Sequence, residues 1–193
     1  MSGTPTAAPS EAAAGIEQLV DTIRRLPASC GETVVVAIDG PSCAGKTQFA
    51  QRLGDSLGAT VVHMDDLYAG WDGLAGAVHG VVDQVLVPLS ALMPARHQRW
   101  DWENDTWHDA PVQVPATEVI IVEGVGSASK VSAPYVALSV WLEAPAQERF
   151  ERAMARDESF RAYWERWAEQ ELEYFRADSP KQRADVVIDT SAR

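Results

Sequence analysis

The pattern of hydrophobic and polar positions along the chain predicts strands that alternate with helices. Unbroken runs of β-branched and other apolar residues predict buried strands at residues 33–38, 60–64, 118–124, 134–142 and 184–189. Apolar residues spaced three and four apart predict helices at residues 10–26, 46–57, 70–93, 146–157 and 158–177. Ser10 is expected to cap the first helix and Gly58 to end the second. Such alternation is typical of an α/β fold.

A glycine-rich stretch lies between the first predicted strand and the helix that follows it. It has the form G-x-x-x-x-G-K-[ST], the phosphate-binding P-loop, and comprises Gly40, Pro41, Ser42, Cys43, Ala44, Gly45, Lys46 and Thr47. Glycine lets the backbone curl so that its N–H groups point at phosphate oxygens. Lys46 can reach the β- and γ-phosphates, and the Thr47 hydroxyl can bind Mg²⁺. A chance glycine-rich turn is the alternative, but the flanking strand and helix are the context that the motif requires.

Carboxylates follow two of the predicted strands directly. Asp65 and Asp66 come after residues 60–64, and Glu123 lies at the end of the strand within residues 118–124. Ligands of α/β sheets bind at the carboxyl ends of the strands, so we favour a functional role over a solvated turn with a capping aspartate. Glu123 has a Walker-B-like position and is expected to hold Mg²⁺, directly or through water.

Two further segments carry charge in unusual patterns. Arg149, Arg152 and Arg156 fall on one face of the helix predicted at residues 146–157, either as a solvated face or as a lid that contacts phosphates. Their local positive charge in a chain of net charge −12 favours the lid. Residues 95–115 mix tryptophans with charged residues, and the sequence leaves open whether they form an acceptor-binding loop or a structural flap.

We expect core packing for Trp71 and for a stripe made of Phe160, Tyr163, Trp164, Trp167, Leu172 and Phe175.

Composition limits the class of protein. The chain of 193 residues most simply forms one domain over residues 11–193, preceded by a disordered tail over residues 1–10. The net charge of −12 argues against a nucleic-acid or anionic-membrane partner. Cys30 and Cys43 are expected to be reduced thiols, and no signal peptide or membrane span is recognisable, so a cytoplasmic location is expected. The cysteines and histidines show no zinc-type spacing.

Several of these elements together resemble a known family. The P-loop, Asp65-Asp66-Leu67-Tyr68, Val122-Glu123-Gly124 and Arg152-x-x-x-Arg156-Asp157 resemble the uridine kinase and phosphoribulokinase group of P-loop kinases. The resemblance extends over about residues 33–190. Trp100-Asp101-Trp102 is similar to the Tyr-Asp-Phe element with which uridine kinases bind the nucleoside. The chain departs from the family in being shorter between Tyr68 and Glu118 and in having an abbreviated arginine-rich lid.

The resemblance implies a fold and an activity. The fold would be the three-layer α/β/α sandwich of P-loop NTPases, with a mainly parallel five-stranded sheet and a short helical lid at about residues 144–162. The activity would be transfer of the γ-phosphoryl group of ATP, with Mg²⁺, to a hydroxyl of a uridine- or cytidine-like acceptor. Asp65 would be the general base and lie near the metal with Thr47 and Glu123. Lys46, Arg152 and Arg156 would contact the phosphates, and the residues expected at the acceptor are Asp66, Tyr68, Trp100, Asp101 and Arg161.

Other functions remain open at the level of sequence. The same scaffold would serve a kinase for an antibiotic, a sugar or a vitamin precursor. A non-catalytic ATP-binding regulatory protein, with the tryptophans of residues 100–107 as a partner-binding face, is a different class. Asp65 favours an enzyme, because ATP binding alone does not need it. The sequence leaves the choice between ATP and GTP open, and likewise the choice between a monomer and a homo-oligomer.

Overall fold

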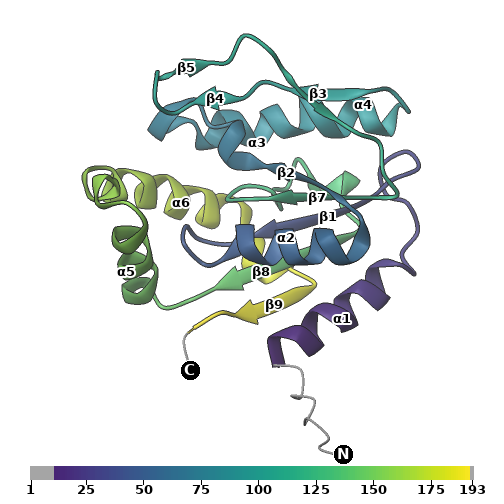
Figure 1. The fold of residues 1–193 in the computed structure, drawn as a ribbon, viewed down its shortest axis with the longest axis horizontal. Helices are drawn as coiled ribbons and strands as arrows, with labels where there is room; N and C mark the ends of the chain where they lie inside the picture. The colour runs from purple at the N-terminus through teal and green to yellow at the C-terminus, as the bar shows by residue number, and fades with distance from the viewer. Residues whose placement is uncertain (1–10, 192–193) are drawn as a thin grey trace, which may run out of the picture.

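The centre of the fold is a five-stranded sheet in which all neighbouring strands are parallel (Figure 1). The computed structural model describes residues 11–191, so the expected tail and the cap at Ser10 lie outside the described residues. The strand order is β2 (Thr60–His63), β7 (Val119–Glu123), β1 (Val34–Asp39), β8 (Leu138–Glu143) and β9 (Val186–Asp189). The predicted α/β fold with a parallel sheet is thereby confirmed. Because β1 is central, the P-loop that follows it lies in the middle of the carboxyl edge.

Helices cover both faces of the sheet, as the alternation of side chains along β1 requires. Val34, Val36 and Ile38 pack with α1 (Glu11–Ile23) and α2 (Lys46–Leu57) in one core cluster. Val35 belongs to the other cluster, which includes residues of α3 (Leu74–Val81) and α6 (Trp164–Asp178). α2 ends at Gly58, whose left-handed backbone and N–H to the Gly54 carbonyl form the predicted C-cap.

The remaining elements are short and lie mostly in the connections. Helical ones are η1 (Met64–Asp66), η2 (Gly70–Asp72), η3 (Val82–Leu86), α4 (Val87–Ser90), η4 (Ala133–Tyr135), α5 (Ala146–Arg156), η5 (Glu158–Ala162) and α7 (Pro180–Arg183). Two antiparallel ribbons pair β3 (Ala95–His97) with β6 (Val112–Val114), and β4 (Trp100–Asp101) with β5 (Thr106–Trp107). Figure 1 shows β3, β4 and β5 beside α3 and α4, at the end of the molecule away from β8 and β9.

The helix predicted for residues 70–93 is broken at its start and contains a π-helical turn. The turn, η3, comes directly before α4, in which Pro88 lies. Proline has no backbone N–H and its ring crowds the preceding turn, so the ordinary hydrogen-bond ladder cannot run through it. Widening the preceding turn is one way to continue a helix past such a residue.

Two predicted boundaries differ most from the structure, and each has a local cause. The strand predicted from residue 134 begins only at Leu138, because Ala133–Tyr135 form a 3₁₀ turn that contains Pro134. The helix predicted from residue 158 begins at Trp164. Before it, the Asp157 carboxylate accepts a hydrogen bond from the Ser159 N–H and caps the separate turn η5.

Asp39, at the end of β1, ties three segments together. Its Oδ1 accepts hydrogen bonds from the N–H groups of Gly40 (2.7 Å) and Gly126 (3.2 Å). Its Oδ2 accepts from the Ala128 N–H (3.0 Å) and from the Tyr174 hydroxyl of α6 (2.7 Å). Burial raises the pKa of Asp39, and these donors oppose that shift. The network fixes the P-loop relative to α6 and to the loop after β7.

We therefore expect Tyr174→Phe to lower the free energy of unfolding by about 1–2 kcal/mol, because a buried carboxylate loses one donor. Urea denaturation followed by circular dichroism measures this. Leu172→Ala on the same helix is the matched control, since Leu172 is 47% exposed and its loss should change stability by less than about 0.5 kcal/mol. Equal stability of Tyr174→Phe and the parent protein would show that the hydroxyl contributes nothing.

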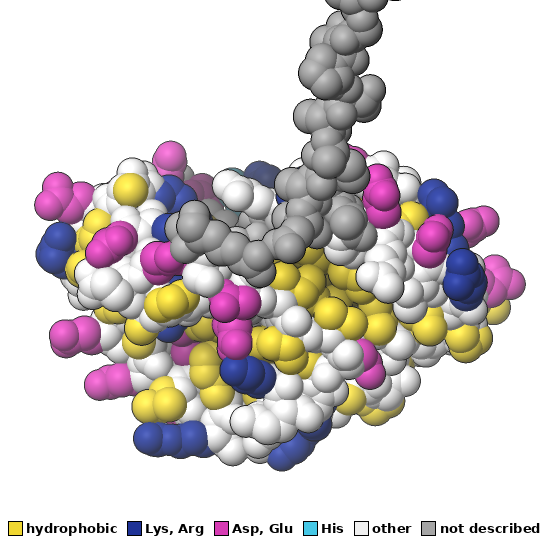
Figure 2. All heavy atoms as spheres, turned by 90° about the horizontal axis from the view of Figure 1, so that it is seen from below, with side chains coloured by type: hydrophobic (Ala, Val, Ile, Leu, Met, Phe, Trp, Pro, Cys, Tyr) yellow, Lys and Arg dark blue, Asp and Glu magenta, His cyan; other side chains and the backbone are white. Residues whose placement is uncertain are grey.

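The outer surface has few features that bear on the site. In Figure 2, which views the molecule from below, hydrophobic side chains gather towards the middle of the face and charged ones surround them. Among the described residues, no helix combines the length and apolar character needed to cross a membrane.

Candidate functional site

A cleft of about 1730 Å³ runs along the carboxyl edge of the sheet, on both sides of the P-loop. At one end it is lined by residues 188–191, which follow or end β9, and at the other by Trp71 and Trp102. Lys46, Asp65 and Glu123 line the same cleft. Pockets for one drug-sized ligand typically measure about 300–1,000 Å³, so this cleft has room for two ligands.

The P-loop has the backbone conformation that its glycines predict. Gly40 has φ 142°, and a Cβ there would lie 2.0 Å from the Leu142 carbonyl oxygen of β8. Gly45 has φ 88° and directly precedes α2. Both positions therefore require glycine. The loop opens at the N-terminus of a 12-residue helix, where backbone N–H groups and the helix dipole favour a bound anion.

Lys46 lies within the curve of the loop. Its ammonium group donates hydrogen bonds to the carbonyl oxygens of Gly40 (2.8 Å) and Pro41 (2.9 Å), and the residue is only 7% exposed. A positive charge held at this place can pair with the phosphates of a nucleotide.

Two helices, α5 and α6, hold the P-loop from outside. Glu171 of α6, itself buried, accepts hydrogen bonds through one oxygen from the Ser42 N–H (2.7 Å) and from the Trp167 indole N–H (2.9 Å). On α5, Arg149 donates to the Ser42 carbonyl and Arg152 to the Cys43 carbonyl. These contacts link the loop to α5 and α6, which Figure 1 shows next to each other.

The predicted lid arginines differ in their surroundings. Arg152 also donates to the Thr190 carbonyl (2.7 Å) and pairs with Glu148 (2.8 Å), so its guanidinium braces the P-loop against the C-terminal segment. Arg156 is exposed, lies over the Phe160 ring at 4.7 Å and lines the cleft. Arg161 lies over the Phe150 ring at 5.4 Å and does not line the cleft.

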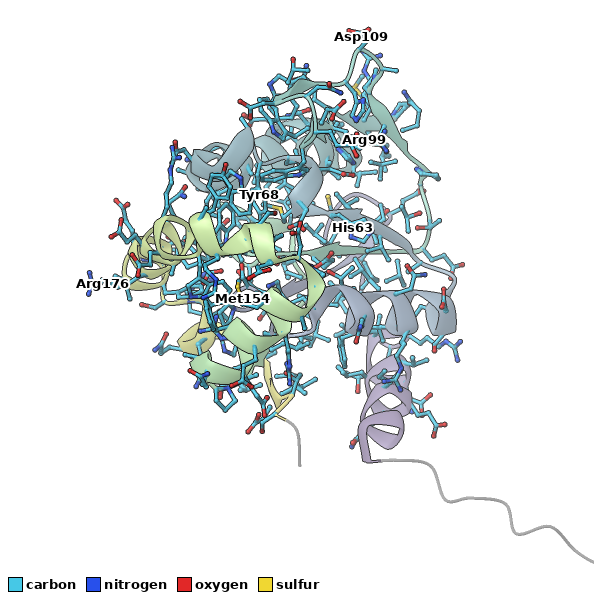
Figure 3. All side chains as sticks on the ribbon, turned by 60° about the vertical axis from the view of Figure 1, so that its left-hand side comes forward. His63, Tyr68, Arg99, Asp109, Met154 and Arg176 are labelled. Carbon is cyan, nitrogen blue, oxygen red and sulfur yellow. The ribbon has the colours of Figure 1, made fainter. Side chains whose placement is uncertain are left out.

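Glu123 joins the P-loop to β2. Its Oε1 accepts a hydrogen bond from the Thr47 hydroxyl (3.2 Å) and lies 2.6 Å from Nδ1 of His63. The hydrogen bond from His63 to the Glu123 carboxylate is the main cause that raises the pKa of His63. His63 is the last residue of β2, at the carboxyl edge of the sheet, and its side chain is 36% exposed (Figure 3).

These side chains fit the requirements of Mg²⁺. The hydroxyl of Thr47 and the carboxylate of Glu123 are hard oxygen donors beside the P-loop. Asp65 is a third oxygen donor near them, since the charge of Glu123 raises its pKa. No group of three or more His, Cys, Asp or Glu residues suited to a metal occurs within residues 11–191. A cation here would therefore complete its shell with phosphate oxygens and water, as Mg²⁺ commonly does.

Asp65 lines the cleft and is exposed to solvent. The surrounding protein raises the pKa of its carboxyl group, and the negative charge of Glu123 raises it further. Lys46, Arg156 and His63 oppose the shift. A carboxylate with a raised pKa, placed beside a phosphate-binding loop, is suited to accept a proton.

Aromatic side chains line the cleft on the side of Asp65. Trp71 stacks on Tyr163 with ring centroids 4.5 Å apart, and its edges meet Trp102 and Phe160, each at 5.1 Å. We call Trp71, Trp102, Phe160, Tyr163, Trp164 and Trp167 the aromatic wall. The expectation that Trp71 and the stripe of residues 160–175 form core was therefore wrong in part. Only Trp167 of the wall is buried, and Leu172 is exposed. The helix begins only at Trp164, so Phe160 and Tyr163 do not continue its helical spacing.

The residues expected at the acceptor are not all at the cleft. Tyr68 lines the cleft, although it is only 2% exposed, and its hydroxyl donates a hydrogen bond to the Val125 carbonyl (Figure 3). Asp101 instead accepts hydrogen bonds from Glu103 and Asn104 and so shapes the β4–β5 turn. Trp100 packs edge-on against Trp107, away from the cleft, and Asp66 does not line it either.

The segment of residues 95–115 lies partly within the domain and partly at the cleft. Ala95, His97 and Val114 are buried, so the β3–β6 ribbon is part of the domain. The turn after β4 instead reaches the cleft, where the Trp102 indole N–H donates to the Asp65 carbonyl oxygen (3.1 Å).

Several important residues were missed from the sequence. Asp39 and Glu171 act through long-range hydrogen bonds, and no local motif marks them, although an acid directly before the first P-loop glycine is a usable signal for Asp39. His63 was missed because its spacing to the other histidines and to the cysteines does not suggest a metal site, and its partner Glu123 is 60 positions away. Cys30 and Cys43 are free thiols, as predicted.

Comparison with known proteins identifies structural relatives. A structure described as that of a possible uridine kinase from Bacillus stearothermophilus is 27% identical in sequence, with a TM-score of 0.67, over 90% of this chain and 97% of that chain. A protein from Silicibacter sp. TM1040, named only provisionally as a fructose transport system kinase, is 19% identical, with a TM-score of 0.62, over 93% and 100% of the two chains. The second likeness shows the fold alone. No family model and no curated protein matches the chain.

Proposed function

We propose that this chain, which is similar to a possible uridine kinase, is a P-loop kinase that transfers the γ-phosphoryl group of ATP to a hydroxyl group of a small acceptor. The observation that carries the proposal is that Asp65 and Lys46 face one cleft. Nucleotide binding alone accounts for Lys46 and the P-loop. It does not account for a carboxylate with a raised pKa beside them.

The two ends of the cleft suggest how the ligands divide it. The phosphates of ATP would lie in the P-loop, between the two ends. The acceptor hydroxyl must reach Asp65, so the acceptor would occupy the end lined by the aromatic wall. The base of the nucleotide would then lie at the opposite end, near Thr190 and Ser191.

The proposed transfer follows from this arrangement. The acceptor oxygen attacks the γ-phosphorus while its proton passes to the Asp65 carboxylate, and the bond to the β–γ bridging oxygen breaks to release ADP. Lys46 and Arg156 stabilise the negative charge on the phosphoryl oxygens. Arg152 keeps the P-loop in position through the Cys43 carbonyl. Mg²⁺, held by Thr47 and Glu123 with support from Asp65, would supply further neutralisation of the phosphates.

A coupled assay of ADP release tests this function. Purified protein with Mg²⁺-ATP is offered nucleosides such as uridine and cytidine, sugars, antibiotics and vitamin-like alcohols, and Mg²⁺-GTP is compared with Mg²⁺-ATP. We expect ADP release that depends on the acceptor and yields a phosphorylated product by mass spectrometry. ATP binding without stimulation by any acceptor would favour a nucleotide-binding regulatory protein instead.

A further inference from the structure

His63 and Glu123 are neighbours across two strands of the sheet. His63 ends β2, Glu123 ends β7, and the two residues are paired in the parallel ladder. Residues paired in this way direct their side chains to the same face of a sheet. Nδ1 of His63 lies 2.6 Å from Oε1 of Glu123. An ionised carboxylate only accepts hydrogen bonds, so the imidazole is the donor.

The same oxygen of Glu123 orients the Thr47 side chain. The Thr47 hydroxyl donates its one proton to Oε1 over 3.2 Å. Its lone pairs are then left for another partner, and a cation beside the P-loop is such a partner. Among the described residues, His63 and Thr47 are the only hydrogen-bond donors to the Glu123 carboxylate. Both donate to Oε1, so Oε2 also keeps lone pairs for a cation.

The orientation of Glu123 depends on His63. The Glu123 side chain is only 4% exposed, and a buried carboxylate that loses a donor turns to find another, because an unpartnered buried charge is costly. The imidazole thus holds the carboxylate, and the carboxylate holds the Thr47 hydroxyl. Carboxylates that bind metals are commonly held by such outer groups, and mutation of these groups typically lowers metal affinity about 10–100-fold.

We propose that His63 is a positioning residue for the metal, and that its hydrogen bond to Glu123 holds the Glu123 and Thr47 oxygens in place for Mg²⁺. The inference rests on the proposed function, since it takes the P-loop as the ATP site. His63 does not line the cleft, so it acts through Glu123 and touches neither the nucleotide nor the acceptor. Loss of His63 should accordingly weaken only the part of nucleotide binding that depends on the metal.

Calorimetry with a non-hydrolysable ATP analogue measures this part and needs no acceptor. The dissociation constant of the analogue is determined once in saturating Mg²⁺ and once in EDTA, and the ratio of the two constants is the gain in affinity from the metal. We expect this gain to fall about 10–100-fold in His63→Ala. The dissociation constant in EDTA should stay within about twofold of the parent value.

Other variants separate the hydrogen bond from the packing of the side chain. His63→Asn keeps an N–H donor near the position of Nδ1 and should recover most of the gain. His63→Leu fills the space without a donor and should behave like His63→Ala. His79→Ala is the control, since His79 is an exposed residue of α3 that does not line the cleft, and its loss should leave the gain unchanged. Thermal unfolding without ligand checks that each variant is folded.

The outcomes distinguish this inference from the proposed function. An unchanged gain in His63→Ala and His63→Leu, or a gain that is lost equally in His63→Asn, would overturn the role of His63 and leave the kinase standing. Weaker binding by the same factor in Mg²⁺ and in EDTA would also overturn it, as would a parent protein that binds the analogue equally in both.

The remaining outcomes concern the kinase itself. The expected ratios, without ADP release for any acceptor, would support the inference about His63 and contradict the kinase. A parent protein that binds no analogue in either condition would contradict both.

Discussion

Lys46→Ala is expected to reduce the turnover number for ADP release about a thousandfold, which is the size of effect seen when one preorganised charge-stabilising group is removed. Lys46 is the cation within the P-loop, held by the carbonyl oxygens of Gly40 and Pro41. When the γ-phosphoryl group is transferred, negative charge spreads over its oxygens, and alanine offers no charge to stabilise it. The coupled assay with saturating acceptor measures the change.

Lys130→Ala is the control for Lys46→Ala. Lys130 is exposed and lies outside the cleft, so its removal also lowers the positive charge by one but should leave turnover within about twofold. Circular dichroism and thermal unfolding establish that Lys46→Ala remains folded. Turnover by a folded Lys46→Ala protein at the parent rate would contradict the assignment of the P-loop as the ATP site.

Asp65→Asn is expected to lower kcat by about 10²–10⁴-fold, the usual contribution of a positioned general base. An amide of the same shape fills the same space but accepts no proton. Because the phosphates are bound mainly by the P-loop, the affinity for ATP should change far less than kcat. Steady-state kinetics and titration with a non-hydrolysable ATP analogue separate the two quantities.

The neighbouring carboxylate is the matched control. Asp66→Asn removes an equal charge one residue away, but Asp66 does not line the cleft, so kcat should stay within a few-fold of the parent value. Equal losses in both variants would indicate that the charge of the segment matters and not the position of Asp65. Parent-like turnover of Asp65→Asn would remove Asp65 as the base.

The pH dependence of kcat/KM for the acceptor gives a further check on Asp65. The base must be ionised in the free enzyme, so activity falls as the pH drops through its pKa. The surrounding protein and the charge of Glu123 raise that pKa, and the acidic limb should therefore lie above the usual range for an aspartate. Loss of this limb in the residual activity of Asp65→Asn would support the assignment.

Features that the sequence determines by itself depend on residues close together along the chain. The spacing of Gly40, Gly45, Lys46 and Thr47 determines the P-loop. The backbone freedom of glycine and the start of the helix after the loop both depend only on residues that are neighbours in the sequence. The apolar runs before Asp65 and Glu123 predict buried strands, and parallel strands bring their carboxyl ends to one edge. Both carboxylates are therefore at the cleft, as predicted.

The tertiary structure alone decides which distant residues meet at that edge. Asp101 is next to two tryptophans in sequence, yet it turns to the backbone of its own hairpin, while Trp102 reaches the cleft. Arg152 and Arg156 share a helix face, but Thr190 lies beside only Arg152 and engages it. Glu171 meets Ser42 across 129 positions of the chain, and Trp71 stacks on Tyr163. Such contacts depend on how α6 and the β4–β5 ribbon pack on the sheet, and helical or strand periodicity carries no information about that packing.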